Sequence, residues 1–417
     1  MATFPTEIIA EILSRTPVKS LLRFKCVCKS WNSLIKCPNF IKLHLNQTLI
    51  SNSDRYLLKA SLDAPFYYAE LDLHPHHLSF TELDHPHEYE EIELFGTCNG
   101  VVCISDYEKI DVFVYNPLTK SHRKLPAKQI PDPENDVVLF GFGYDSQNDD
   151  YKVLRIIQGY ICRKRCYDGA QLYSLNKNSW KSVQGIPKSY YLPYADGHGV
   201  LVNEGLHFIV SSDELDLQQR KRIANFDLRT EKFSLIECPK HDEKSKTKWD
   251  YLEFHIRKLG GCLSVMVVYL TKRYAHVPLD DDDRRNRVFE RADLWVMREH
   301  GNQDSWVKQF SISELVAYGS SFTSINPLVY SKDGRRVLIE IDCFEVGWYD
   351  PESKLYEKLT PLGLPNTYFD TGCIMGSLVS VEYKGHPEIQ SGTFPRKNKK
   401  NNKGPDNFLS VGFKLKL

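Results

Sequence analysis

The sequence predicts a small all-α segment of three helices at the N-terminus, followed by a larger, mostly β body. Residues 3–45 repeat apolar side chains at helical spacing. From about residue 55 onward, short β-like runs alternate with turns, and no long amphipathic helix competes with them. The 23 Tyr and 21 Phe also favour strands, because aromatic side chains fit the pleated, half-buried surface of a sheet.

Three short helices are expected in the N-terminal segment. Thr3 can cap the first, with Pro5 in its first turn, where a missing N–H costs nothing. Thr16 and Pro17 repeat this arrangement before a second helix over 18–24. A third helix follows, and Pro38 ends it. The apolar residues of the segment are Ile8, Ile9, Ile12, Leu13, Leu21, Leu22, Cys26, Val27, Trp31, Leu34 and Ile35.

These helices are too short to enclose much apolar surface. A unit of about 40 residues usually needs a metal, a disulfide or a partner to be stable. The segment has no metal-ligand pattern, and a disulfide is not expected in a reducing compartment. Several side chains are too apolar to leave in water: Leu21, Leu22, Val27 and Trp31. They either bind a partner or pack on the chain's own large domain, and the pattern leaves both readings open.

The body contains a recurring unit, in which an aromatic or apolar strand, a polar turn and a second strand follow one another. Its copies lie at 112–126, 171–183, 225–236, 293–308 and 347–359, with a weaker one at 67–83. Runs that look more buried lie between the copies, at 100–104, 137–142, 200–210, 263–270 and 337–341. The spacing of roughly 50 to 70 residues is near the blade length of kelch-type propellers. Because a single blade cannot bury both of its faces, we expect a closed ring.

Composition excludes some classes of function. Lys plus Arg and Asp plus Glu both total 54, so a dominant nucleic-acid or membrane-surface role is unsupported. There is no secretory signal pattern, and no apolar run reaches the length of about 18 residues that a membrane helix needs. The 11 scattered Cys indicate reduced, mostly buried thiols. We therefore expect a cytoplasmic or nuclear protein without a bound cofactor.

The densest group of candidate metal ligands is a set of five histidines. Its spacing fits no common zinc pattern, because the prolines at 75 and 86 keep this stretch extended. We expect an exposed polar turn and no metal site. The histidines are His74, His76, His77, His85 and His87.

Other clusters also favour structural roles. Cys162 and Cys166 flank three basic residues, an arrangement that suggests a surface loop whose cations could lower a thiol pKa. Cys98 and Cys103 are expected in the core. The run of Asp and Arg over 280–285 lacks the register of a calcium loop, so a solvated loop is expected.

The C-terminal residues differ from the body in composition. Residues 392–406 are polar, basic and poor in apolar side chains, which predicts disorder. A nuclear-import patch and a merely solvated tail are both open readings of the basic residues. The chain thus divides into a docking segment over 1–45, a propeller over 46–385 and a polar tail over 386–417.

The string FPTEIIAEILSRTPVKSLLRFKCVCKSWNSLIKCPNF (4–40) closely resembles the plant F-box motif. Phe4 and Thr16 depart from it, since Leu usually precedes each of the two prolines. The resemblance implies docking to the Skp adaptor and, through it, to the cullin and RING subunits of an SCF ubiquitin ligase. The implied docking residues are Pro5, Ile8, Ile9, Leu13, Pro17, Val18, Leu21, Leu22, Cys26, Val27 and Trp31.

Four strings resemble the plant F-box-associated domain, a kelch-like propeller. They are GTCNGVVCI (96–104), VYNPLTKSHRKLP (114–126), FGFGYDSQNDDYKVLRI (140–156) and RADLWVMREHGNQDSWVKQFSI (291–312). The double glycine of kelch repeats occurs clearly only at Gly260-Gly261. We expect six blades, with seven as the alternative.

Together these features predict a non-catalytic adaptor that recruits a substrate protein for ubiquitination. No nucleophile elbow, phosphate loop or Cys/His pairing with a recognisable context is present. One alternative is a propeller enzyme or sugar-binding module. Its concrete form is a kelch-like copper oxidase, which would need Tyr, His and Cys to converge at one propeller face. Another is a receptor that binds a small ligand and uses the F-box for signalling.

Overall fold

The structure is a computed structural model. It describes residues 4–61, 65–74, 76–87, 92–106, 108–128, 136–161, 164–192, 197–212, 221–240, 251–272, 287–313, 324–365, 367 and 369–382. The contacts divide the chain into two compact units, Met1–Tyr383 and Lys384–Leu417. The polar tail predicted over 386–417 therefore lies outside the described residues, as do Cys162 and the charge run over 280–285.

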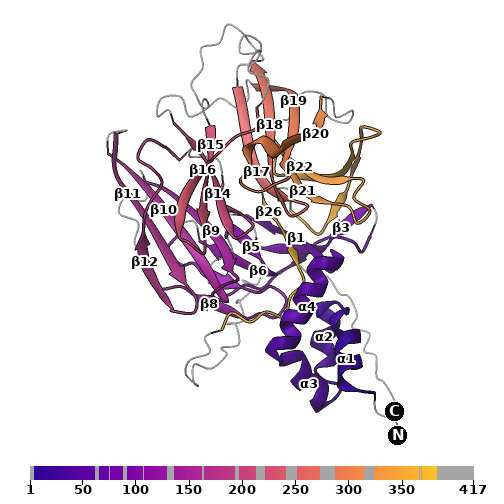
Figure 1. Ribbon diagram of the computed structural model, residues 1–417. Coiled ribbons are helices and arrows are strands. Elements are labelled where there is room, and N and C mark those ends of the chain that lie inside the picture. The colour runs from indigo at the N-terminus through magenta and orange to yellow at the C-terminus, as the bar shows by residue number, and fades with distance from the viewer. Residues whose placement is uncertain are drawn as a thin grey trace, which may run out of the picture. The chain divides into compact units, whose positions relative to one another are not determined.

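Four helices form the N-terminal segment (Figure 1): α1 (Thr6–Ser14), α2 (Val18–Phe24), α3 (Lys29–Lys36) and α4 (Pro38–Ser51). The three expected helices are confirmed, and α4 is additional. Pro38 lies in its first turn, where the missing N–H has no intrahelical partner to lose. Asn52 then ends α4 in the left-handed conformation, with φ 47°. Among the described helices, none is long and apolar enough to cross a membrane.

The predicted capping by Thr16 is wrong. Pro17 occupies the cap position of α2 with ψ 144°, and no side chain within the helix caps it. The Thr16 hydroxyl instead donates back to the Ile12 carbonyl at 3.2 Å. This backward bond leaves the first N–H groups of α2 to a partner from elsewhere in the chain.

The body consists of six four-stranded antiparallel sheets. From its first strand to its fourth, the first sheet consists of β26 (Asp370–Met375), β1 (Arg55–Ala60), β2 (Tyr67–Glu70) and β4 (Thr81–Glu82), and the second of β5 (Glu93–Cys98), β6 (Val101–Ser105), β7 (Phe113–Tyr115) and β8 (His122–Lys124). The third sheet consists of β9 (Val137–Asp145), β10 (Asp150–Ile161), β11 (Lys164–Ser174) and β12 (Ser179–Val183), and the fourth of β13 (Val200–Val202), β14 (Gly205–Ser211), β15 (Lys221–Asp227) and β16 (Lys232–Glu237). The fifth sheet consists of β17 (Tyr251–Leu259), β18 (Cys262–Lys272), β19 (Arg287–Met297) and β20 (Trp306–Ile312), and the sixth of β21 (Ile325–Tyr330), β22 (Val337–Ile341), β23 (Glu345–Asp350) and β24 (Leu355–Lys358). We number these sheets blades 1 to 6. A short parallel pair, β3 (His77–Ser79) with β25 (Thr360–Leu362), links blades 1 and 6.

The six blades form a closed ring, which confirms the predicted propeller. The first strands of successive blades contact one another from β26 through β5, β9, β13, β17 and β21 back to β26. Blade 1 closes the ring because its first strand comes from the C-terminal side. Arg55 in β1 pairs with Met375 in β26, and Ala60 pairs with Asp370. Closure of this kind covers the outer faces of the first and last blades, which an open array would leave exposed.

The recurring unit in the sequence corresponds to the third and fourth strands of each blade. Its turn repeats one geometry, in which the Asn116 side chain accepts hydrogen bonds from two backbone N–H groups further along the turn, those of Leu118 and Thr119. Asp227 and Asp350 do the same in blades 4 and 6. The residue four places on adopts positive φ, at 63° for Lys120, 57° for Glu231 and 59° for Lys354. Asn and Asp suit this position because their side chains bond the backbone two residues on.

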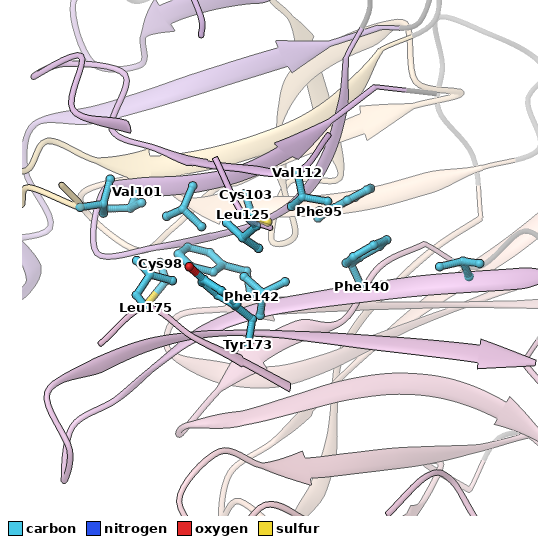
Figure 2. Close-up of a cluster of buried hydrophobic side chains, with 14 of the residues drawn as sticks. Phe95, Cys98, Val101, Cys103, Val112, Leu125, Phe140, Phe142, Tyr173 and Leu175 are labelled. Carbon is cyan, nitrogen blue, oxygen red and sulfur yellow. The ribbon is translucent and has the colours of Figure 1, made fainter. Parts of the chain in front are cut away.

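The core lies between neighbouring blades. Figure 2 shows the cluster between blades 2 and 3, where the rings of Phe95 and Phe140 stack with centroids 4.2 Å apart. Cys98 and Cys103 belong to this cluster, so their predicted place in the core is confirmed. Burial raises the pKa of the Cys98 thiol to about 12, which keeps it protonated and inert.

The predicted exposed histidine turn is wrong for two of its five members. His74 and His76 are exposed and His77 is half-buried, but His85 and His87 are only 4% exposed. The His85 ring packs against Phe66, and the His87 ring packs against Phe113. The described residues contain no group of three His, Cys, Asp or Glu side chains arranged to hold a metal. Cys166 lies in β11, where a loop was expected.

Candidate docking surface

The eleven residues predicted to dock the adaptor fall into two sets. Leu13, Val18 and Leu21 are 2%, 0% and 0% exposed and form the inner core of the helical segment with Ile35 and Phe40. Burial of this kind leaves them unavailable to a partner, so they support the docking surface from within. Half-buried members are Ile9, Leu22 and Trp31, and exposed members are Pro5, Ile8, Pro17, Cys26 and Val27.

We define the candidate docking surface by four exposed apolar side chains before α4, namely Phe4, Ile8, Ile12 and Val27. Leu43, Leu49 and Ile50 on α4 are exposed as well. Ile8 and Ile12 are one helical turn apart on α1, so they lie on the same face. Ile12 is 62% exposed and Val27 is 61% exposed, and no described part of the propeller covers them. Large apolar side chains that stay exposed on a small helical segment are typical of a protein-binding site. Phe4 and Ile12 were not among the predicted docking residues, although Ile12 shares the apolar spacing of α1.

The helical segment also packs on the propeller. Leu378, which follows β26, is 4% exposed and lies in the same cluster as Leu13, Val18 and Leu21. Leu118, from the turn between β7 and β8, packs against that cluster. The reading that the helices pack on the chain's own domain is therefore confirmed, while binding of a partner to the apolar side chains that stay exposed remains a prediction. The sequence analysis did not identify Leu378 as a core residue. The serines that lie before Leu378 and between the apolar residues Val379 and Val381 could have indicated a partly buried segment.

Residues 376–382, which we term the C-terminal strap, hold this junction together. The Asn116 side-chain amide donates to the carbonyls of Ser377 at 3.0 Å and Val379 at 2.8 Å. Gly376 lies so close to the junction that an added Cβ would stand 1.9 Å from the Asp54 carboxylate. The strap thus fills the space between helices and blades, and only glycine fits at its start.

Asp54 supplies the cap that α2 lacks within its own sequence. Its Oδ2 accepts the Val18 N–H at 2.9 Å, while its Oδ1 accepts the Tyr56 hydroxyl at 2.8 Å. A carboxylate at a helix N-terminus satisfies an unpaired donor and complements the helix dipole. The first blade therefore completes the second helix of the N-terminal segment.

Ion pairs at the edge of the junction add to this contact. Lys19 in α2 donates to Glu70 in β2 at 2.5 Å and lies over the Tyr68 ring at 4.6 Å. Burial alone would lower the pKa of Lys19, but the hydrogen bonds to Glu70 and Tyr68 outweigh it and raise the pKa. Lys42 in α4 pairs with Asp149 in the turn between β9 and β10 at 2.7 Å. Blades 1 and 3 therefore contact the helices through side chains of opposite charge, and blade 2 contacts them through Leu118.

The two ends of the propeller differ. The contacts to the helices come from the turns between first and second strands, from a turn between third and fourth strands, and from the strap. The strand ends that lead to the connections between second and third strands, and between blades, lie at the opposite end, which we term the far end. In the sequence these connections are the longest between strands, as with the one between Lys272 in β18 and Arg287 in β19, whose residues lie outside the described part of the chain.

Comparisons with known proteins match both parts of the chain. A family model of the F-box domain matches residues 2–43, and one of the F-box associated beta propeller domain matches residues 48–342. F-box protein CPR1 of Arabidopsis thaliana is 31% identical over 444 residues and covers 100% of both chains. F-box protein At4g22390 of the same plant is 29% identical over 447 residues, again with 100% of both chains covered.

More distant matches add less. F-box/kelch-repeat protein At3g23880 of Arabidopsis thaliana is 29% identical over 346 residues, covering 81% of this chain and 85% of that protein. The name of this relative gives weak support to the kelch-like interpretation. The double glycine Gly260-Gly261 of this chain forms only the turn between β17 and β18. The solved structure of the Dos1 propeller is similar with a TM-score of 0.36 and 10% identity over 75% of this chain and 69% of that one. The two family models together cover the helical segment and most of the ring. The chain therefore belongs to the plant F-box proteins with an F-box-associated β-propeller.

Proposed function

We propose that this protein is the substrate-recognition subunit of an SCF ubiquitin ligase. The observation that carries the proposal is the bare apolar surface of the F-box, in a segment whose opposite side already packs on the propeller. Ile8, Ile12 and Val27 remain exposed. A partner that covers them would be the Skp adaptor, which would connect the chain to cullin and RING subunits. Assembly of this kind would take place in the cytoplasm or nucleus.

The substrate would bind the far end of the propeller. The F-box occupies the end where the short turns lie, so a substrate at the other end would not compete with the adaptor. Longer connections are also where proteins usually place recognition, because a rigid scaffold positions them and they tolerate sequence change. The chain would then act without covalent chemistry, by raising the effective concentration of target lysines near a ubiquitin-conjugating enzyme.

The proposal is tested by comparing two variants in plant cells, using tagged full-length chains. Ile12→Glu with Val27→Glu places charge on the docking surface. Leu355→Glu is the matched control, since Leu355 is 66% exposed on β24 and does not belong to the cluster of the helices. Proteins that bind the propeller should accumulate on the docking variant and lose their ubiquitin chains. On the control they should remain ubiquitinated. Equal ubiquitination on both variants would contradict the proposal.

A further inference from the structure

A cavity runs along the centre of the ring. Its volume is about 1020 Å³, and residues from the first strands of all six blades line it, including Asp370 of β26, Phe95 of β5, Leu139 of β9, Arg257 of β17 and Asn326 of β21. This volume is of the size that proteins use to enclose small organic ligands. Apolar residues such as Leu94 and Leu139 line it together with many polar and charged ones, among them Glu93, Lys109 and Asp370.

Three polar groups in the cavity have unused bonding capacity. The Asp370 carboxylate forms no hydrogen bond or ion pair with any described residue. Asn326 is 3% exposed, and its Oδ1 is buried without a hydrogen-bond partner among the described residues. The Arg257 guanidinium donates to the carbonyl of Ile256 at 2.8 Å, and no carboxylate in the described part of the chain pairs with it. Asn326 is the buried member of the three, and an unpaired buried acceptor is costly, so it favours a ligand donor. Asp370 is exposed and Arg257 is half-buried, so both are open to a ligand group of the opposite charge.

Neighbouring charged groups, by contrast, are already satisfied. The Phe140 N–H donates to Nδ1 of His198 at 3.2 Å, so the ring proton lies on Nε2, which donates to Glu93 Oε1 at 2.7 Å. Burial alone would raise the pKa of Glu93, but the bond from His198 and the charge of Lys109 together lower it. On the other side, Lys59 and Glu340 form a buried ion pair at 2.6 Å. These neighbouring charged groups are paired with one another, whereas Asp370, Asn326 and Arg257 keep bonding capacity for a ligand.

We propose that the cavity binds a small amino-carboxylate, whose ammonium pairs with Asp370 and Asn326 and whose carboxylate pairs with Arg257. Asp370 and Asn326 are acceptors and Arg257 is a planar cationic donor, so the ligand should carry a cationic donor at one end and an anionic acceptor at the other. An ammonium suits a carboxylate better than a hydroxyl does, because a charge-assisted hydrogen bond is about twice as strong as a neutral one. Arginine is the side chain that best fits a carboxylate, through two parallel N–H···O bonds. The site is independent of the docking surface and of the substrate proposed for the far end.

The environment of Asp370 gives the site a pH dependence. Burial raises its pKa to about 6, and the charges of Glu93 on β5 and Glu340 on β22 add to this effect. His198, before β13, and Arg257 on β17 oppose it. Below that pH the carboxyl is protonated and cannot pair with an ammonium. Binding should therefore weaken as the pH falls through about 6.

Isothermal titration of the purified full-length chain with each of the twenty free L-amino acids tests the proposal. At least one should bind, and Asp370→Asn and Arg257→Gln should each weaken that binding by about tenfold or more. The matched controls Glu352→Gln and Arg335→Gln change exposed residues outside the cavity and should leave it unchanged. Thermal unfolding verifies folding, and Asp370→Asn should not lower the melting temperature because no bond is lost.

Three results would overturn the assignment. They are the absence of binding by every amino acid, binding that survives both substitutions, and binding of galacturonate, a polyhydroxylated acid without an amine, in place of the amino acids. Strengthening of binding between pH 7 and pH 5 would also contradict it, since the Asp370 carboxylate is required in its charged form.

Discussion

Replacing Leu378 with Ala should loosen the F-box while leaving the ring of blades intact. Leu378 is 4% exposed in a cluster whose other buried members are Leu13, Val18, Leu21, Ile35 and Phe40. Truncating a buried leucine to alanine costs about 2–5 kcal/mol, through lost burial and the cavity left behind. Six buried side chains form a small core, so this loss is a large part of what holds the helices in place.

Hydrogen exchange followed by mass spectrometry measures the effect directly. Peptides from α1 to α3 should exchange at least about tenfold faster in Leu378→Ala, since every 1.4 kcal/mol of local stability is a factor of ten in the open population. Peptides from blades 3 and 4 should be unchanged. Leu355→Ala is the control, because Leu355 is 66% exposed and its truncation should have little effect. Unchanged exchange in α1 to α3 would refute the reasoning, and so would an equal increase in every blade.

Three further predictions concern the junction and the ring. Lys59→Met should lower the free energy of unfolding by about 3–5 kcal/mol in chemical denaturation, because it leaves Glu340 buried and unpaired; adding Glu340→Leu should restore much of the loss, and additive effects would contradict the pairing. Asp370→Asn should raise the melting temperature at pH 8 but not at pH 4. The raised pKa of Asp370 means that its protonated form favours the fold, which is destabilised as the pH rises through about 6. An equal shift of the melting temperature at both pH values would count against an unpaired carboxylate. Asn116→Ala should cost about 1–3 kcal/mol and accelerate exchange in residues 376–382, since it removes the bonds to the strap, whereas protection that stays intact there would exclude that role.

The sequence predicted the features that arise from local chemistry. The turn after Asn116 and its counterparts at Asp227 and Asp350 could be recognised because one side chain fixes each turn. Their spacing then indicated the blades. The helix α4 was missed because Pro38 both ends α3 and begins the next helix, and a proline alone does not distinguish the two roles.

The features that were missed depend on contacts between distant parts of the chain. The closed ring was expected, but not the pairing of Arg55 with Met375 that closes it, because no local pattern indicates that pairing. His85 looked exposed because its neighbours in sequence are polar, but Phe66 lies against its ring in the fold. The unused groups of the cavity come from three different blades, so no spacing of residues could have linked them. Some of the predicted docking residues are buried for the same reason, since Leu378 from the C-terminal part of the sequence covers part of the F-box core.

The central claim is that the exposed face of the F-box docks an adaptor while the other face stays on the propeller. The most direct measurement is light scattering after size-exclusion chromatography of the full-length chain mixed with a purified plant Skp adaptor. A one-to-one complex should form with the natural chain and with Leu355→Glu. Ile12→Glu with Val27→Glu should weaken it by about a hundredfold or more, because two charges would be buried in place of two apolar side chains. A complex that forms equally well with this variant would contradict the claim.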